Sequence, residues 1–210
     1  KIESTPLEDS SKAGDVLENC HVDGILIPGG FGQRGINGMV NASRWAREKK
    51  IPYFGICLGL QVMVIDWARH VLGWEDADSL EFNQDTRHPV ISLPEDQMDL
   101  KNYGGNMRLG KGDSMAEPDT LILKAYGYRN FSERHRHRYE FSNARRKEIS
   151  DSGLILAAFT PDGALVESVE WPDHPWGMGV QFHPEFKSKP TAAHPLFRDF
   201  IAAAKKKHAG

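Results

Sequence analysis

The stretch Pro52-Tyr53-Phe54-Gly55-Ile56-Cys57-Leu58-Gly59-Leu60-Gln61 decides the fold of this chain. Its apolar beginning predicts a short buried strand over residues 52–57. Residues 58–72 are apolar at helical spacing and end at Gly73, which is typical of a helix C-terminus. A strand that passes directly into a helix, with Cys57 at the corner and a glycine two positions to either side, has the G-x-nucleophile-x-G form of a nucleophile elbow.

The segments before this stretch complete a βαβ unit. Residues 22–28 read as a second buried strand, because three consecutive apolar residues are stopped by a proline and two glycines. Residues 37–50 carry apolar side chains at helical spacing, with charges on the far side. Strand, helix and strand in this order imply parallel pairing and a right-handed crossover.

The segments after it supply further strands and a closing helix. Residues 154–160, 164–171 and 178–182 are strand candidates, and residues 192–207 predict a helix. Residues 74–119 hold short apolar pieces among many glycines and prolines, which favours an antiparallel extension. We therefore predict an α/β fold: an open, mostly parallel sheet with helices on both faces and a small antiparallel extension. Such a sheet usually begins with one more strand and helix, so we expect sequence to be missing at the start.

Composition bounds the function. The 210 residues predict one domain, 1–210, and the net charge of −3 with pI near 6.3 gives no general attraction for nucleic acid or anionic lipid. No apolar run reaches the roughly 20 residues of a membrane span, so we expect a cytoplasmic protein without nucleic-acid or membrane partners. Two cysteines, Cys20 and Cys57, make no disulfide framework, so Cys57 is either core filler or a nucleophile.

The elbow favours the interpretation of Cys57 as a nucleophile. It presents the sulfur of Cys57 at the N-terminus of a helix, where backbone N–H groups favour thiolate over thiol. His183-Pro184-Glu185 follows a predicted strand, and residues two apart in an extended segment project to the same side. Glu185 can therefore orient the His183 imidazole, which would act as general base and acid. Taken alone, this segment could equally be an exposed His-Glu pair.

A glycine-rich loop supplies the remaining element of an acyl-transfer site. Pro28-Gly29-Gly30-Phe31-Gly32 ends the first predicted strand, at the same carboxyl edge of the sheet as Cys57. We expect the N–H groups of Gly30 and Leu58 to form an oxyanion hole. A phosphate cradle is the alternative, but neither of the two glycine-rich nucleotide-binding patterns is complete here.

These three segments, PGGFG, GICLGLQ and QFHPEF, resemble the class I glutamine amidotransferases in sequence and order. The resemblance implies a flavodoxin-like three-layer sandwich and a triad of Cys57, His183 and Glu185. It also implies that glutamine is bound by a set of residues around the elbow and two beyond it: Gly30, Leu58, Gly59, Leu60, Gln61, Glu81 and Arg138. The chemistry agrees for the last two, because glutamine presents an ammonium for a carboxylate and a carboxylate for a guanidinium.

Two further segments, GGNMRLG at 104–110 and ERHRHRYE at 133–140, are similar to one branch of this class. In that branch the glutaminase is joined to an amidoligase domain that uses ATP and Mg²⁺ and the released ammonia to aminate UTP. The resemblance implies that this chain is the glutaminase part, that it holds no cofactor itself, and that GTP activates it at the domain junction. Phe31 and Arg108 are the expected contacts of GTP.

Alternatives remain open at this point. Residues 129–147 hold seven Arg and Lys against two Glu, which is typical of a solvated face or a polyanion contact. His135 and His137 could ligate a metal, but no third ligand lies at a recognisable zinc spacing, so we expect none. Beside the predicted function stand a glutaminase of another class I amidotransferase, a γ-glutamyl peptidase, and a catalytically silent binding module.

Overall fold

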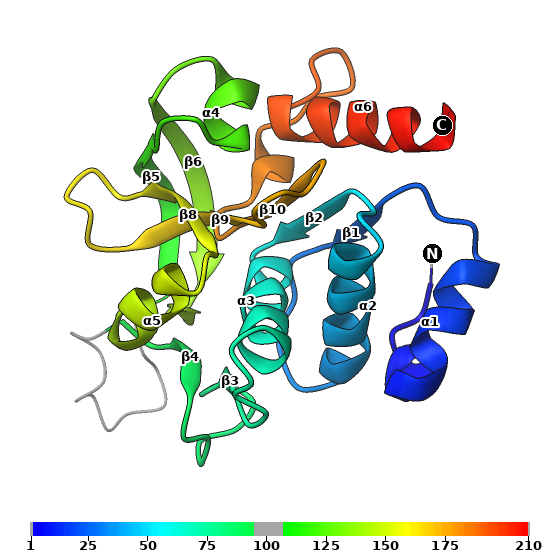
Figure 1. The fold of residues 1–210 in the computed structure, drawn as a ribbon. Helices are drawn as coiled ribbons and strands as arrows, with labels where there is room; N and C mark the ends of the chain where they lie inside the picture. Colours follow the sequence, from blue (N-terminus) through cyan, green and yellow to red (C-terminus); the bar gives the residue numbers. More distant parts are fainter. Residues whose placement is uncertain (1, 95–106, 210) are drawn as a thin grey trace.

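The computed structural model describes residues 2–94 and 107–209 of the chain. Its centre is a seven-stranded sheet of order β1-β2-β10-β9-β8-β5-β6 (Figure 1). These strands are β1 (Ile25–Ile27), β2 (Tyr53–Ile56), β5 (Arg108–Ala116), β6 (Asn130–His137), β8 (Ile155–Phe159), β9 (Val166–Glu170) and β10 (Gly177–Val180). A separate sheet consists of β3 (Asp78–Ser79), β4 (Pro89–Ser92) and β7 (Glu140–Phe141).

The parallel half of the large sheet positions the elbow. Strands β1, β2 and β10 pair in parallel. Helix α2 (Ile36–Glu48) joins β1 to β2, as the βαβ prediction requires, and α3 (Leu58–His70) follows β2 directly. Successive side chains of β2 point to opposite faces: Tyr53 packs in the core with α2 and α3, and Phe54 packs on the aromatic rings of α6 (Pro195–Ala209).

The other half of the sheet is antiparallel. Strand β9 pairs antiparallel with β10, and β8, β5 and β6 continue in the same sense. A tight turn at Pro161-Asp162-Gly163 joins β8 to β9, and so short a connection allows only antiparallel pairing. The predicted fold class is confirmed. Its antiparallel part is larger than expected, because it supplies four of the seven strands and continues the main sheet.

Helices cover both faces of the sheet (Figure 1). Helices α2 and α3 lie on one face, while α4 (Leu121–Tyr126) and α6 lie together on the other. The shorter helical segments are η1 (Thr5–Leu7), η3 (Asn143–Arg145), α5 (Arg146–Asp151) and η4 (Pro184–Phe186). Among the residues described, no helix combines the length and apolar character needed to cross a membrane.

A helix that the sequence pattern did not indicate precedes β1. Helix α1 (Ser10–Asn19) begins after Asp9, whose carboxylate accepts a hydrogen bond from the N–H of Ser11. Its buried Ala13 and Leu17 pack with Ala42 of α2. Ala13, Val16 and Leu17 lie at helical spacing, but they are only three apolar side chains in a mostly polar segment, so α1 gives a weaker sequence signal than α2 and α3. The expectation of an earlier strand stays a prediction.

Candidate active site

The elbow forms at Cys57, between β2 and α3. This residue has φ 53° and ψ −100°, and its N–H donates to the carbonyl of Val180 on β10 over 2.7 Å. A Cβ at Gly55 would stand 2.4 Å from the carbonyl carbon of Gly59, and a Cβ at Gly59 would stand 2.3 Å from the carbonyl oxygen of Ile27. Both flanking glycines are therefore required, because backbone segments pass where a side chain would begin.

His183 and Glu185 lie at the end of β10, beside the elbow. The N–H of His183 donates to the carbonyl of Arg134 on β6 over 2.8 Å, and its Nδ1 lies 2.6 Å from Oε1 of Glu185. The ring of Phe186 stacks on the imidazole at 4.7 Å and 8°. A Cβ at Gly29 would stand 2.6 Å from Cε1 of His183 and 3.6 Å from Cβ of Cys57. The fold thus brings sulfur, imidazole and carboxylate together.

The surroundings favour a charged imidazole. Burial acts to lower the pKa of His183, but the sulfur of Cys57 and the carboxylate of Glu185 outweigh it and raise that pKa to about 9. Nδ1 is engaged by Glu185, whereas the buried Nε2 makes no hydrogen bond within the described part of the chain. The sulfur of Cys57 lies close enough to stabilise the charged imidazole, although no hydrogen bond to Nε2 is formed. Nε2 is therefore the ring nitrogen that is available to exchange a proton with the thiol.

Replacing Glu185 by glutamine should lower the pKa of His183 from about 9 toward its ordinary value of 6.5, because the carboxylate that stabilises the imidazolium is lost. An NMR titration of the imidazole protons measures this. In the wild type, a raised pKa means that the stabilising contribution of His183 is complete below pH 6.5 and is lost as the pH rises through 9. The melting temperature of the variant should fall less over that interval, and an equal fall in both proteins would contradict the assignment.

The glycine-rich loop lies over the elbow. A Cβ at Gly30 would stand 2.9 Å from Cδ2 of Leu58, so these two residues are in contact. Leu58 begins α3, and the N–H of a first helical residue has no partner inside the helix. The N–H of Gly32 donates to Oε1 of Glu81 over 3.1 Å, which anchors the loop. The two predicted oxyanion donors therefore lie at the same edge of the sheet as Cys57.

Replacing Gly29 by alanine should reduce turnover about 100-fold while the chain still folds. The new methyl group would overlap Cε1 of His183 at 2.6 Å, and the imidazole would move to relieve it. Displacement of a catalytic group by about 1 Å is enough for such a loss. Steady-state kinetics measures turnover, and the circular dichroism spectrum shows that folding is retained. Unchanged turnover in the folded variant would show that the ring position is not critical.

The expected glutamine ligands lie around this edge of the sheet, but the side chain of Leu60 points away from it. Gln61 donates through Nε2 to the carbonyl of Tyr139 over 2.9 Å, next to the exposed Arg138. The side chain of Leu60 is fully buried in the core under the sheet, so only its backbone is available to a substrate.

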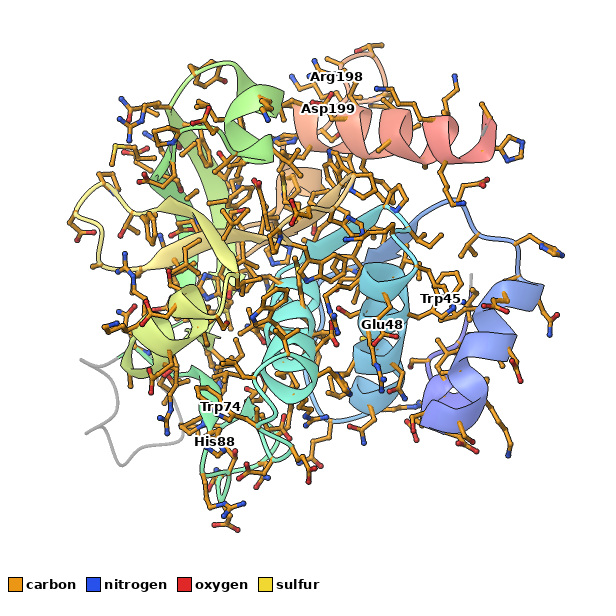
Figure 2. The ribbon with its side chains drawn as sticks, in the orientation of Figure 1. Trp45, Glu48, Trp74, His88, Arg198 and Asp199 are labelled. Atoms are coloured by element: carbon orange, nitrogen blue, oxygen red, sulfur yellow. The ribbon has the colours of Figure 1, made fainter. Side chains whose placement is uncertain are left out.

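The two ends of the segment that carries Glu81, residues 74–88, contact each other. Trp74, just after α3, stacks on His88, just before β4, at 4.8 Å and 15° (Figure 2). Nδ1 of His88 lies 2.6 Å from the carboxylate of Asp76, which also accepts from the backbone N–H of Arg87. These contacts join both ends of residues 74–88. They hold Glu81 in place although it lies outside any strand or helix.

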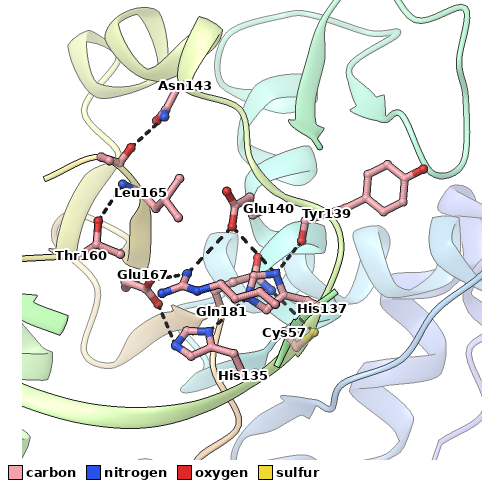
Figure 3. A network of polar contacts seen from close by, with 12 residues as sticks. Cys57, His135, His137, Tyr139, Glu140, Asn143, Thr160, Leu165, Glu167 and Gln181 are labelled. Atoms are coloured by element: carbon pink, nitrogen blue, oxygen red, sulfur yellow. Dashed lines mark hydrogen bonds and ion pairs between the residues drawn. The ribbon is translucent and has the colours of Figure 1, made fainter. Parts of the chain in front are cut away.

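Gln181 is a site residue to which sequence reasoning gave no role. Its Nε2 donates to Sγ of Cys57 over 3.6 Å, and its Oε1 lies 3.5 Å from Nε2 of Gln61 (Figure 3). It is fully buried. Gln181 lies directly after β10 and two residues before His183, in the same QFHPEF segment, so a signal for it was present in the sequence.

The basic segment is a strand whose arginines form a solvated face and whose alternate side chains are buried. Alternate side chains of β6 are buried, among them His135 and His137, while Arg134 and Arg136 are exposed. Nδ1 of His135 lies 3.1 Å from Nε2 of His137, which in turn contacts the carbonyl of Tyr139 through Nδ1 (Figure 3). Burial, followed by the nearby guanidinium of Arg108, lowers the pKa of His135 to about 2 and that of His137 to about 3. Both imidazoles are therefore neutral.

An ion pair connects these histidines to β9. Nη1 of Arg108 lies 2.6 Å from Oε1 of Glu167, and Nε2 of His135 lies 3.5 Å from its Oε2 (Figure 3). Burial raises the pKa of Glu167, against the opposing effect of Arg108. Arg108 and Met107 are described, whereas residues 104–106 of the GGNMRLG segment lie outside the described residues. No group of three or more His, Cys, Asp or Glu within 2–94 and 107–209 is placed to hold a metal.

Comparison with known proteins agrees with this geometry. A family model described as glutamine amidotransferase class-I matches residues 1–203. The CTP synthase of Clostridium acetobutylicum is 58% identical over 183 residues, which are 87% of this chain and 34% of that protein. The CTP synthase of Dehalococcoides mccartyi is 50% identical over 206 residues, 98% of this chain and 38% of that protein. The chain thus spans about a third of the length of the curated relatives it matches.

Solved structures give the same result. The glutaminase domain of Trypanosoma brucei CTPS with bound acivicin has a TM-score of 0.90 and 40% identity, covering 98% of this chain and 80% of that one. A GMP synthase-like protein from Thermoplasma acidophilum, at 16% identity and a TM-score of 0.62, shares the fold and covers 95% of this chain and 80% of its own.

The fold, the elbow and the family match together define a class I glutamine amidotransferase, and this chain belongs to that family. Within the family it belongs with the glutaminase domains of CTP synthases, at 50–58% identity to the curated relatives described above.

Proposed function

We propose that this chain hydrolyses L-glutamine through Cys57, His183 and Glu185. The thiolate of Cys57 attacks the side-chain amide carbon, and the N–H groups of Gly30 and Leu58 stabilise the oxyanion. The carbon–nitrogen bond then breaks, and the imidazolium of His183 protonates the leaving ammonia. A water molecule, deprotonated by the same imidazole, hydrolyses the thioester, which releases glutamate and restores the thiol.

The substrate contacts follow from the charges of free glutamine. Glu81 would accept its α-ammonium and Arg138 would pair with its α-carboxylate. Gly30, Gln61, and the backbone from Leu58 to Leu60 would surround the side-chain amide. Acivicin, bound in the trypanosomal domain, is expected to occupy the same place.

The ammonia would serve a second reaction in a longer protein. We propose that it aminates UTP to CTP in an amidoligase domain, because the CTP synthases that this chain matches are about two and a half times its length. ATP and Mg²⁺ would bind in that domain, with no cofactor in residues 1–210. GTP would activate the glutaminase at the domain junction, near the fully exposed Phe31 and the partly exposed Arg108.

The observation that carries this proposal is the meeting of Cys57, His183 and Glu185 at one edge of the sheet. The sulfur and the carboxylate on either side of the imidazole favour its charged form and so raise its pKa. A catalytically silent module would have no need of a strained Cys57 backbone or of a charged imidazole. A γ-glutamyl peptidase would share the triad, so the substrate decides between the two enzymes.

Ammonia release tests the proposal. The chain is incubated with L-glutamine and, separately, with γ-glutamyl dipeptides, and ammonia, glutamate and free amino acids are quantified. Release of ammonia and glutamate in equal amounts from glutamine, with at least tenfold slower cleavage of the dipeptides, is the expected result. Faster cleavage of the dipeptides would identify a peptidase, and turnover of neither substrate together with no labelling of Cys57 would identify a silent module.

A further inference from the structure

The segment that carries His183 and Glu185 is held from below by a buried carboxylate. Residues 183–194 make up most of the connection from β10 to α6, and apart from the short η4 they form no helix or strand. Beneath them lies Glu133, on the inward face of β6 and fully buried in its side chain. A buried carboxylate is costly unless it is paired, so its partners show what it holds.

Those partners come from both ends of the segment. Oε1 of Glu133 lies 3.2 Å from Nζ of Lys187 and 3.0 Å from Nε2 of His194. The same oxygen accepts a hydrogen bond from the hydroxyl of Tyr126 over 2.9 Å. Lys187 also donates to the carbonyl of Ser132 over 2.6 Å. One carboxylate of β6 thus binds the segment four residues after the triad histidine and again where α6 begins.

The contacts of His194 show which ring nitrogen faces Glu133. Its Nδ1 accepts a hydrogen bond from the N–H of Leu196 over 3.3 Å, so Nε2 is the nitrogen that donates to Glu133. Lys187 supplies the ammonium group that pairs with the buried carboxylate, so the ion pair is formed by a residue of the segment itself.

β6 also holds the main chain of the triad histidine directly. The N–H of His183 donates to the carbonyl of Arg134, the residue that follows Glu133. The carboxylate therefore acts close to the catalytic imidazole without touching it. We infer that Glu133 is a positioning residue for His183 and Glu185, acting through Lys187, His194 and the backbone of β6. This inference rests on the proposed function, because it assigns a role in that reaction.

The isosteric variant Glu133→Gln is the main test. Glutamine keeps an oxygen for Tyr126 and His194 but loses the charge that pairs with Lys187. We expect kcat for glutamine hydrolysis to fall about tenfold, because the imidazole is less well placed. KM should change less than about twofold, since Glu133 faces inward on β6, whereas Arg138, the expected glutamine ligand nearest to it in sequence, is exposed just beyond the end of that strand.

The rate of Cys57 alkylation by iodoacetamide, followed against pH in a Cys20→Ser background, gives a second measurement. The variant should show a shifted pH profile, because the thiolate depends on the nearby imidazolium. Glu170→Gln is the matched control. Glu170 is equally buried but binds the backbone N–H groups of Leu121 and Ile122, so its variant should keep the wild-type profile.

The outcomes for the proposed function and for the role of Glu133 can be told apart. If wild-type chain shows neither ammonia release nor alkylation of Cys57, the proposed function fails. If the wild type is active and folded Glu133→Gln matches it in kcat and pH profile, the inference alone is overturned. Should Glu133→Gln not fold, Lys187→Gln carries the same test, because Lys187 is about half exposed, and Tyr126 and His194 still donate hydrogen bonds to the buried carboxylate of Glu133. An unchanged Lys187→Gln would then overturn the inference.

Discussion

Cys57→Ala is expected to abolish glutamine hydrolysis. The alanine variant lacks the atom that attacks the amide, and no other described cysteine lies near: Cys20 is exposed at the end of α1. In enzymes of this type, removal of the nucleophile alone costs about as much as removal of the whole triad, on the order of 10⁶-fold in kcat. The measurement is ammonia release from glutamine at saturating substrate.

The fold of this variant should survive, because the backbone N–H of residue 57 keeps its hydrogen bond to Val180 and only the long contact of Gln181 with the sulfur is lost. An unchanged melting temperature, within about 2 °C, would show this. Cys20→Ser is the matched control and should retain full activity. Hydrolysis at more than about 1% of the wild-type rate by folded Cys57→Ala would contradict the assignment of the nucleophile.

Gly59→Ala is expected to have the largest effect on stability. Its new Cβ would stand 2.3 Å from the carbonyl oxygen of Ile27 and 3.1 Å from the carbonyl carbon, so β1 or α3 would have to shift. Overpacking of this kind costs about 3 kcal/mol. For a chain of this size that corresponds to a fall in melting temperature of about 6–12 °C, measured by differential scanning calorimetry.

Gly14→Ala is the matched control, since it makes the same chemical change. Gly14 lies in α1, where a Cβ would meet Cδ1 of Trp45 at an ordinary 3.8 Å. Alanine is the better helix former by about 1 kcal/mol, so this variant should melt slightly higher than the wild type. Equal melting temperatures for the two variants would show that Gly59 is not required by the close approach of α3 to β1.

The parts of the site that are local in sequence could be predicted. Gly55 and Gly59 flank Cys57 within one turn of chain, and His183 and Glu185 are only two residues apart. The extended backbone expected for this pair is wrong, however: Pro184–Phe186 form the 3-10 helix η4, and its tight turn brings the Glu185 carboxylate to the imidazole. The contact between the Cys57 elbow and the segment of Gln181 and His183 could not be predicted from local sequence. Gln181 contacts Cys57 across 124 residues, because β10 inserts between β2 and β9. Only the resemblance to a family indicated that juxtaposition, because a strand order is not written in any local pattern.

The failures have physical reasons as well. Strand β6 alternates buried histidine and glutamate with exposed arginine, so its period of two is hidden from any search for apolar residues. Its inward polar groups are buried because they pair with one another and with Glu167, Lys187 and His194. Those partners lie on β9 and beyond β10. Such a segment is buried because its polar side chains pair with residues on distant strands. The composition of the segment alone does not indicate these partners.

A peptide mass spectrum after treatment with a glutamine-mimicking electrophile shows most directly whether the sulfur at the elbow is activated by the imidazole of His183, with Glu185 behind it. We expect one adduct, on Cys57, whose formation is blocked by excess glutamine and is slowed at least tenfold by His183→Ala. An adduct on Cys20 alone, or modification of Cys57 at the same rate with and without glutamine and His183, would contradict it.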